Sequence, residues 1–156
     1  MEVKIETATT KLLDKLFEIE EQCFEQEAFT KRQIAYLLTD YNTIALVARV
    51  NNELAGFIIA QIEIDDSTLF GHIITINVSP NFRRKGVATE MIQDIEGILK
   101  KKDINKCHLE VREDNTSAIK LYQKCGYQKF GKLEKYYGNK HALYFKKTLC
   151  LWHQPI

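Results

Sequence analysis

A basic turn between an apolar strand and a helix is the stretch of this sequence that most clearly suggests chemistry. It contains Arg83, Arg84, Lys85 and Gly86 and follows a strand that ends at Val78. The first N–H groups of a helix have no partner within the helix, and the helix dipole adds partial positive charge there. Glycine also lets a ligand approach the backbone closely. The turn is therefore predicted to bind an anion that carries phosphate.

A nucleotide P-loop does not fit this turn, because the sequence contains no G-x-x-x-x-G-K-[ST] pattern. The formal net charge of +1 gives the chain no overall attraction to nucleic acid or to a membrane surface. Phosphate binding must therefore come from local geometry. The 156 residues, 45% of them hydrophobic, are predicted to form a single domain over 1–156 with no nucleic-acid partner.

Other features of the sequence limit where the protein works and what it binds. It has no apolar run of about 18 residues, and its first ten residues lack the basic and apolar regions of a secretory signal. We therefore predict a cytoplasmic protein without a membrane partner. The four cysteines form no C-x-x-C pair, and no histidine lies at zinc-finger spacing from them, so reduced thiols and no metal are expected. They are Cys23, Cys107, Cys125 and Cys150.

The first half of the chain predicts one strand, two helices and then an antiparallel meander of three strands. Thr30 and Gln33 have the spacing of a capping box, which predicts that a helix begins there. Asn51-Asn52 suits a two-residue hairpin turn between apolar, β-branched runs. The predicted strands are 3–7, 43–50, 54–64 and 69–78, and the predicted helices are 11–23 and 30–38.

The second half predicts helix, strand, helix, strand, strand. An apolar stripe marks the helix that begins at Val87, while Asn115 and Gly126 are the predicted caps of the next helix. The predicted strands are 107–112, 127–136 and 142–151. The full order, β-α-α-β-β-β-α-β-α-β-β, favours an α/β fold whose mixed sheet has helices on both faces. The strand–helix–strand unit at 69–111 predicts a parallel pair of strands.

Two blocks of the sequence resemble the GCN5-related N-acetyltransferase (GNAT) superfamily. Residues 83–88, RRKGVA, fit its [Q/R]-x-x-G-x-[G/A] signature. Residues 109–127 fit the L-[E/H]-V-R-x-x-N-x-x-A-x-x-L-Y-x-x-x-G-[F/Y] block of its N-terminal acetyltransferases. The branch that the chain resembles contains the ribosomal-protein-alanine (RimI-type) and archaeal N-α-acetyltransferases. In the family's Y-Y…D-A ending, His141 stands where an acidic residue is usual.

The resemblance implies the GNAT fold, a mostly antiparallel seven-stranded sheet flanked by four helices, with acetyl-coenzyme A as co-substrate. The turn would hold the pyrophosphate of coenzyme A through its N–H groups. The strand before it would pair with the pantetheine arm, and the Val78 N–H would polarise the thioester carbonyl. The implied cofactor residues are Ile76, Asn77, Val78, Arg83, Arg84, Lys85, Gly86, Val87, Ala88, Thr89, Asn115 and Tyr122.

Acyl transfer to an amine requires the neutral amine. At pH 7 its formation costs about 1 kcal/mol for an α-amino group and about 4.6 kcal/mol for a lysine side chain. A modest general base is therefore enough for a protein N-terminus. The resemblance implies that Glu110 is this base, acting through water, and that Tyr122 protonates the departing thiolate. It also implies that His72 assists catalysis, whereas His108 and His141 are interpreted as structural.

The resemblance further implies that acceptor selection lies in two segments that flank the amine entrance in the family. The candidate substrate-binding residues are Phe24, Glu25, Phe29, Tyr136 and Tyr137. The predicted function is transfer of an acetyl group to the N-terminal α-amino group of a protein in a ternary complex, with a ribosomal protein as one such acceptor. Two alternatives stay open: a lysine or small-amine acetyltransferase on the same fold, and a non-catalytic acyl-coenzyme A-binding regulatory domain.

Overall fold

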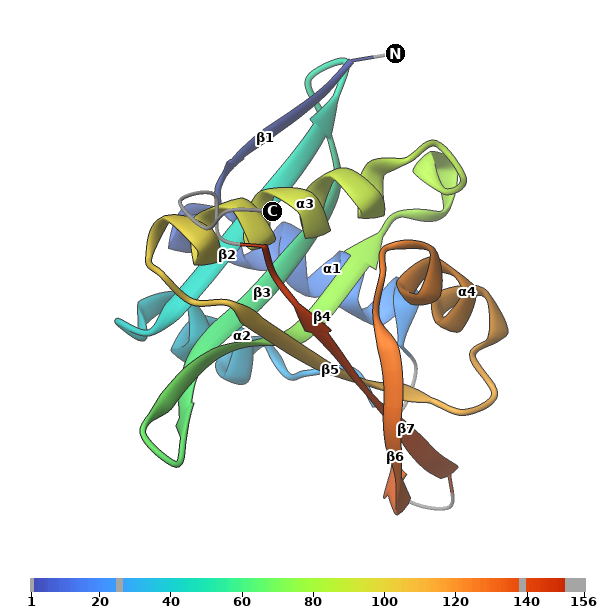
Figure 1. Cartoon of the computed structure of the whole chain (residues 1–156). Coiled ribbons are helices and arrows are strands. Elements are labelled where there is room, and N and C mark those ends of the chain that lie inside the picture. The colour runs from blue at the N-terminus through green and yellow to red at the C-terminus, as the bar shows by residue number, and fades with distance from the viewer. Residues whose placement is uncertain (1, 25–26, 138–139, 151–156) are drawn as a thin grey trace.

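Seven strands form one mixed sheet in the order β1-β2-β3-β4-β5-β7-β6 (Figure 1). The structure, a computed structural model, describes residues 2–24, 27–137 and 140–150, without the side chains of Lys135 and Tyr137. The strands are β1 (Val3–Thr7), β2 (Thr43–Val50), β3 (Glu53–Asp65), β4 (Thr68–Val78), β5 (Lys106–Arg112), β6 (Gln128–Tyr137) and β7 (Lys140–Thr148). The helices are α1 (Leu13–Cys23), α2 (Lys31–Thr39), α3 (Val87–Lys101) and α4 (Thr116–Lys124).

The predicted element order and the mixed α/β class are confirmed. Neighbouring strands pair antiparallel except β4 and β5, which are parallel as the strand–helix–strand unit predicts. The predicted bounds were less accurate at two ends. A 3₁₀ turn, η1 (Thr10–Leu12), precedes α1, which begins at Leu13 and not at residue 11. Strand β7 ends at Thr148, and the predicted end at Leu151 lies outside the described residues.

The helices cover the two faces of the sheet in separate layers. Helix α3 lies across one face, where the buried side chains of Met91, Ile92 and Ile95 join the core formed with β5 and α4 (Figure 1). Helices α1 and α2 cover the other face, where Leu16 and Ile34 pack against β2 and β3. Each fully buried aliphatic side chain stabilises the fold by about 1.5–3 kcal/mol. The two cores make the sheet a rigid support for whatever lies at its edges.

Two of the helix starts that the sequence predicts are confirmed by their caps. The Gln33 N–H donates to Thr30 Oγ1 over 3.1 Å, and the Thr30 N–H donates to Gln33 Oε1 over 2.8 Å, so both halves of the capping box form. Asn115 caps α4 by accepting the Ala118 N–H at 3.2 Å. Because a cap fixes where a helix begins, these bonds also fix the segments that precede α2 and α4.

One turn and one glycine help to set the register of the meander. Asn51 and Asn52 both have positive φ, 51° and 67°, as the predicted hairpin turn requires. A Cβ at Gly56 would lie 2.3 Å from the carbonyl oxygen of Asn77, so only glycine allows β3 and β4 to approach there. This close approach supports β4 where it runs toward the basic turn.

Strands β4 and β5 separate halfway along their length. Their register covers only residues 71–73 of β4 and 107–109 of β5. A bulge in β4 at Ile74 shifts its register with β3, and Figure 1 shows β4 and β5 diverging beyond this region. The second half of β4 and the end of β5 therefore border a gap in the hydrogen-bonding of the sheet.

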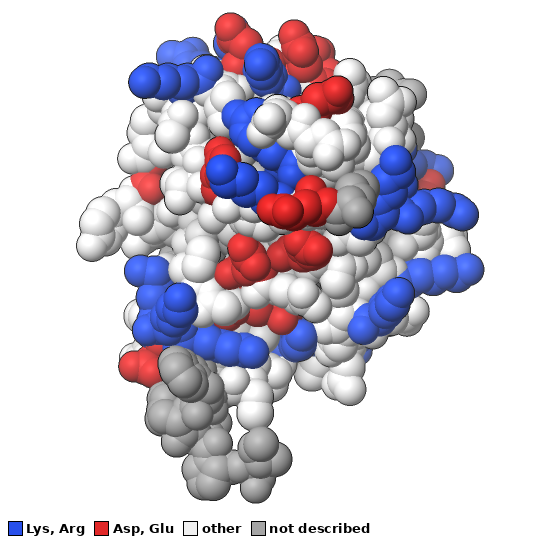
Figure 2. All heavy atoms as spheres, turned by 90° about the horizontal axis from the view of Figure 1, so that it is seen from above, with Lys and Arg blue, Asp and Glu red and all other residues white. Residues whose placement is uncertain are grey.

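Charged side chains of both signs are interspersed on the surface. Figure 2 shows Lys and Arg beside Asp and Glu on the face seen from above, in keeping with the net charge of +1. Anion binding therefore depends on the local arrangement of donors and charges, and not on one large field of a single sign. Within the part of the chain that the structure describes, no helix is long and apolar enough to cross a membrane.

Candidate active site

Three ionisable side chains from three strands meet where β4 and β5 diverge. His72 on β4 lies between two carboxylates: its Nε2 is 2.7 Å from Glu110 Oε1 on β5, and its Nδ1 is 2.8 Å from Glu63 Oε2 on β3. The Glu110 side chain is 13% exposed, that of His72 19% and that of Glu63 38%. The predicted base, Glu110, and the predicted assisting residue, His72, are thus in direct contact, and Glu63 lies on their solvent side.

The two carboxylates determine the charge state of His72. Burial by itself would lower the pKa of the imidazole, but the hydrogen bonds and charges of Glu110 and then Glu63 raise this pKa to about 9. His72 is therefore an imidazolium at neutral pH, and it donates to Glu110 Oε1. The other carboxylate oxygen of Glu110, Oε2, takes no part in that bond, so it is the atom suited to accept a proton from a neighbouring group.

His108 lies near these three side chains but differs from His72 in its protonation state. Its ring stacks on Phe70 with centroids 4.2 Å apart, and its Nδ1 is 2.7 Å from the Tyr144 hydroxyl. Burial, followed by the charges of Lys146 and His72, lowers the pKa of His108 to about 4. His108 is therefore neutral at pH 7 and packed between aromatic rings, in agreement with its interpretation as structural.

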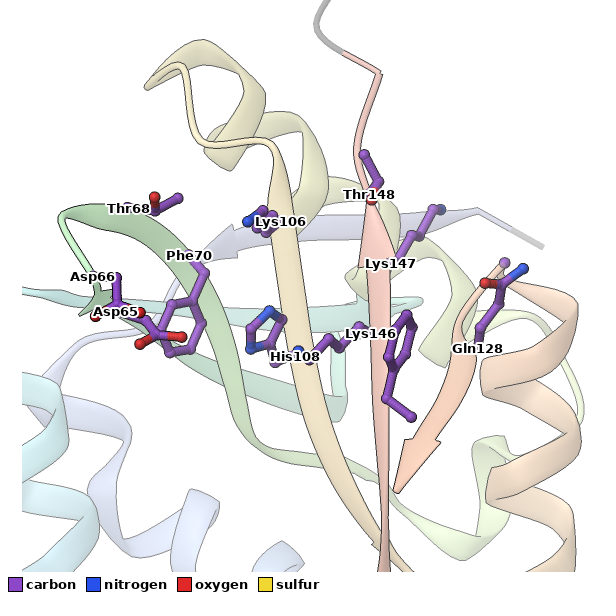
Figure 3. A pocket seen from close by; sticks show the side chains of 12 residues that line it. Asp65, Asp66, Thr68, Phe70, Lys106, His108, Gln128, Lys146, Lys147 and Thr148 are labelled. Carbon is purple, nitrogen blue, oxygen red and sulfur yellow. The ribbon is translucent and has the colours of Figure 1, made fainter. Parts of the chain in front are cut away.

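The stacked pair forms one wall of a cavity of about 560 Å³ between the β3–β4 turn and the ends of β5 and β7 (Figure 3). Its charged lining mixes Lys106 and Lys146 with Asp65 and Asp66. Figure 3 shows Phe70 and His108 side by side between these groups. Sequence reasoning did not find this cavity, because it collects residues from five separate strands. Its mixed charge gives no preference for one class of ligand.

The basic turn has the geometry of an anion site. Gly86 is the N-cap of α3 with φ 80°, and no side chain caps that helix end. Arg84 also has positive φ, 61°, and both it and Lys85 are exposed. A Cβ at Gly86 would meet no atom within 4 Å, so the backbone conformation and the open space in front of it are what favour glycine. The side chain of Val87 is buried in the core, which leaves only its backbone to contact a ligand.

Arg83 differs from the other two basic residues of the turn. Its Nε donates to the carbonyl oxygen of Val78 over 3.0 Å, and its Nη2 lies 3.5 Å from Cys23 Sγ. The Ser79 N–H donates to Ala55 on β3, so by alternation the backbone groups of Val78 face the opposite edge. That edge of β4 borders the gap beside β5. The side chain of Arg83 lies at the Val78 end of this edge.

Asn77 belongs to a buried polar network. Its Nδ2 donates to Glu20 Oε1 over 3.1 Å and to Thr75 Oγ1 over 3.0 Å, and Thr75 donates to the same Glu20 oxygen. Asn77 Oδ1 is the buried side-chain polar atom that lacks a partner among the described residues. The side chain of Asn77 is thus directed toward α1, so its predicted role in cofactor binding gains no support from this contact.

Glu20 joins the two sides of the site. Its Oε2 accepts the Phe29 N–H at 3.2 Å, so this carboxylate ties α1 and β4 to the segment before α2. Burial raises the pKa of Glu20, while the bonds from Phe29, Thr75 and Asn77 oppose that rise. Sequence reasoning missed Glu20 as a functional residue. The available signal was an acidic residue on the apolar stripe of a helix.

Two candidate residues lie on or before α4. Asn115 is engaged as the N-cap described above. Tyr122 is 6% exposed and packs edge-to-face against Tyr127, with centroids 6.3 Å apart. Its ring belongs to the core beside α3, and its proposed contact with the reacting sulfur stays a prediction.

Of the two predicted entrance segments, the first begins at the end of α1 and the second lies at the end of β6. Arg112 at the end of β5 pairs with Glu27 at 2.7 Å and with Asp114 at 2.6 Å, which attaches the segment before α2 to β5. Phe24 and Phe29 are half-buried, whereas Glu25 and the side chain of Tyr137 lie outside the described residues. Burial, followed by the charges of Glu110 and Glu63, raises the pKa of Tyr136, which places this tyrosine near the predicted base.

Comparisons with known proteins show what this chain is similar to. The family model described as "Acetyltransferase (GNAT) family" matches residues 11–127. The chain is 31% identical over 116 residues to an N-alpha-acetyltransferase of Sulfurisphaera tokodaii, covering 69% of this chain and 70% of that protein. It is 34% identical over 102 residues to the N-terminal acetyltransferase B complex catalytic subunit NAA20 of Arabidopsis thaliana, covering 63% of this chain and 58% of that one.

A third relative matches in both sequence and structure. The [ribosomal protein bS18]-alanine N-acetyltransferase of Escherichia coli is 32% identical over 87 residues, 56% of either chain. The crystal structure of the ribosomal-protein-S18-alanine N-acetyltransferase from that organism superimposes with a TM-score of 0.85 at 20% identity, covering 99% of both chains. The aligned sequence thus spans less than two thirds of the plant and bacterial relatives, while the fold corresponds over nearly the whole chain.

Proposed function

This chain belongs to the acetyltransferase (GNAT) family, and on that premise we propose that it transfers the acetyl group of acetyl-coenzyme A to the N-terminal α-amino group of a protein. The observation that carries the proposal is the contact between Glu110 and His72 at the point where β4 and β5 diverge. The relatives named above as N-alpha-acetyltransferases support an α-amine as the acceptor.

The residues present fit coenzyme A. The uncapped N-terminus of α3 and the exposed side chains of Arg84 and Lys85 suit its pyrophosphate. The outward edge of β4 at Ile76 and Val78 suits the amide groups of its pantetheine arm, because backbone N–H and C=O groups there have no partner strand in β5. When bound, acetyl-coenzyme A supplies a thioester whose carbonyl carbon is the electrophile.

Glu110 prepares the acceptor in this proposal. A protein N-terminus is mostly protonated at pH 7, and about 1 kcal/mol is needed to free its lone pair. Glu110 accepts that proton, directly or through one water molecule, while His72 holds its other oxygen at 2.7 Å. The imidazolium of His72 donates to Glu110, so the pair combines a carboxylate base with a hydrogen-bond donor that orients it.

Tyr122 and the Val78 N–H act on the thioester, at its departing thiolate and its carbonyl oxygen. The phenol of Tyr122 protonates the departing thiolate, and its ring is held in position by packing against Tyr127. The Val78 N–H, on the edge away from β3, stabilises the oxyanion. A thiol pKa near ~8.5 makes the thiolate a tolerable leaving group, so Tyr122 accelerates the reaction without being indispensable.

The acceptor is selected at Phe24, Phe29, Tyr136 and Tyr137, and the favoured first residue is alanine, as in a ribosomal protein. The bacterial relative's printed substrate, an alanine of a ribosomal protein, supports this specificity. A lysine or small-amine acceptor is the competing specificity on the same scaffold, and a cytoplasmic location stays a prediction. A non-catalytic acyl-coenzyme A-binding domain has no need of the Glu110–His72 contact.

Mass spectrometry of an acetylation assay tests the proposal. The purified chain is incubated with acetyl-coenzyme A and a set of peptides that differ only in their first residue and contain one internal lysine. Each peptide is also supplied with a blocked N-terminus as a control. We expect α-acetylation of free peptides, fastest for alanine, and no product from blocked ones. Acetylation confined to lysine side chains or to small amines would overturn the α-amine specificity.

A further inference from the structure

We propose that Glu63 is a positioning residue of the acetyl-transfer site, holding His72 by its Nδ1 so that the Nε2–H group is directed at Glu110. This proposal rests on the proposed function for its kinetic consequence, although its structural part can be tested in the free protein. Glu63 lies outside the two sequence blocks that resemble the GNAT superfamily.

The contact geometry determines the form of the imidazole. An ionised carboxylate only accepts hydrogen bonds, and each nitrogen of His72 lies within 2.8 Å of a carboxylate oxygen. Both contacts are satisfied only when both nitrogens carry a proton. His72 is then already protonated and cannot accept the proton of the acceptor amine. Its role in the site is to donate to Glu110, and Glu63 is the partner that keeps it in that role.

The position of Glu63 suits this role. It is the most exposed of the three groups at 38%, and it binds the ring nitrogen that points away from Glu110. It is in register with Phe70, while His72 is in register with Gln61, so the two are diagonal neighbours across β3 and β4. A salt bridge in such a half-buried place is less screened than a surface pair.

The titratable groups around His72 come from several strands. Strand β3 brings Glu63, β5 brings Glu110 and the neutral His108, β6 brings Tyr136 near the two carboxylates, and β7 brings Tyr144 next to His108. Among these groups, the two carboxylates raise the pKa of His72, to about 9. Because the pKa of His72 is raised, the imidazolium loses its proton only as pH rises through about 9. On the alkaline side of that pH, the donor to Glu110 is lost.

The test is the pH profile of Glu63→Gln with an α-amine peptide as acceptor. In the natural chain we expect kcat to fall on the alkaline side near pH 9. In the variant only one carboxylate still raises the pKa of His72, so this alkaline limb moves to lower pH by about one unit or more. For a shift of one unit, the kcat ratio of natural chain to variant is then near one at pH 6.5 and about three at pH 8.5, and it is larger for a larger shift. KM for acetyl-coenzyme A stays unchanged.

Three comparisons make the result decisive. Glu63→Asp keeps the charge and should return the alkaline limb toward pH 9, while Glu53→Gln, on the exposed start of the same strand, should leave the profile unchanged. An NMR titration of His72 in the free protein measures the same pKa without any substrate, so it decides about Glu63 even if α-amines are not acetylated. An unchanged alkaline limb together with an unchanged His72 titration in Glu63→Gln would overturn the proposal.

Discussion

The two sides of the candidate site are built in different ways. The proposed cofactor side lies mostly in one stretch, from Ile76 to Thr89, where the groups expected to bind are mostly backbone groups set by φ angles and a helix end. The acceptor side is assembled from side chains, since Glu63, His72 and Glu110 come from three strands and meet only through the register of the sheet. A backbone site depends on local conformation, whereas a side-chain site depends on the whole sheet.

Substitutions should therefore separate the two sides. Those on the acceptor side should change turnover and leave coenzyme A binding intact. Those in the turn should do the reverse.

The largest effect is expected at Glu110. Glu110→Gln keeps the shape of the side chain but removes the base, so turnover should fall by roughly ten- to a thousand-fold. Coenzyme A affinity, measured by calorimetry, should stay within a few-fold of the natural value because Glu110 is not part of the turn. Unchanged turnover would show that Glu110 is not the base. A large loss of coenzyme A binding would show that the acceptor side and the cofactor side are not separate.

Gly86→Val is expected to produce the opposite result. A β-branched residue is strained at φ 80° and adds bulk in the open space before α3. Coenzyme A binding should weaken by about ten-fold or more, because a strain of 1–2 kcal/mol and a steric clash act together. Gly97→Ala, inside α3 where a Cβ also meets nothing within 4 Å, is the matched control and should bind normally. Natural affinity in Gly86→Val would refute the assignment of the loop.

Glu20→Gln tests the one residue that joins both sides. The amide nitrogen that replaces one carboxylate oxygen cannot accept the Phe29 N–H while the remaining oxygen keeps Thr75 and Asn77. We expect a loss of about 1–3 kcal/mol in the free energy of unfolding. KM for the acceptor peptide should rise more than KM for acetyl-coenzyme A, because the released segment lies at the amine entrance. Equal changes in both KM values would contradict this assignment.

The smallest effect is expected from Arg84→Ala. Its side chain is exposed and contributes to anion binding as a surface charge, so coenzyme A affinity should fall by roughly two- to five-fold, and less at high salt. Turnover at saturating acetyl-coenzyme A should stay the same. Lys101→Ala, at the other end of α3, serves as a control for net charge. A change in saturated turnover would show that the turn does more than bind the cofactor.

Features that depend on short-range spacing could be predicted from the sequence alone. The capping pairs at Thr30 and Asn115, the hairpin turn at Asn51-Asn52 and the alternation of helical and strand periods predicted the element order, and the structure confirms it. The basic turn could be recognised for the same reason, because its ligands are neighbours in the chain. Glu110 was found through its block, although that block does not say what the carboxylate contacts.

Only the tertiary structure decided which side chains meet. The contact of Glu63 with His72 depends on the register of β3 with β4, and that of His72 with Glu110 depends on the parallel crossover that brings β5 beside β4. The bond from Glu20 to Phe29 and the turn of Arg83 back onto Val78 likewise join segments that have no common local pattern. Strand register and helix docking are set by burial of the two cores as a whole, so no local window of the sequence contains them.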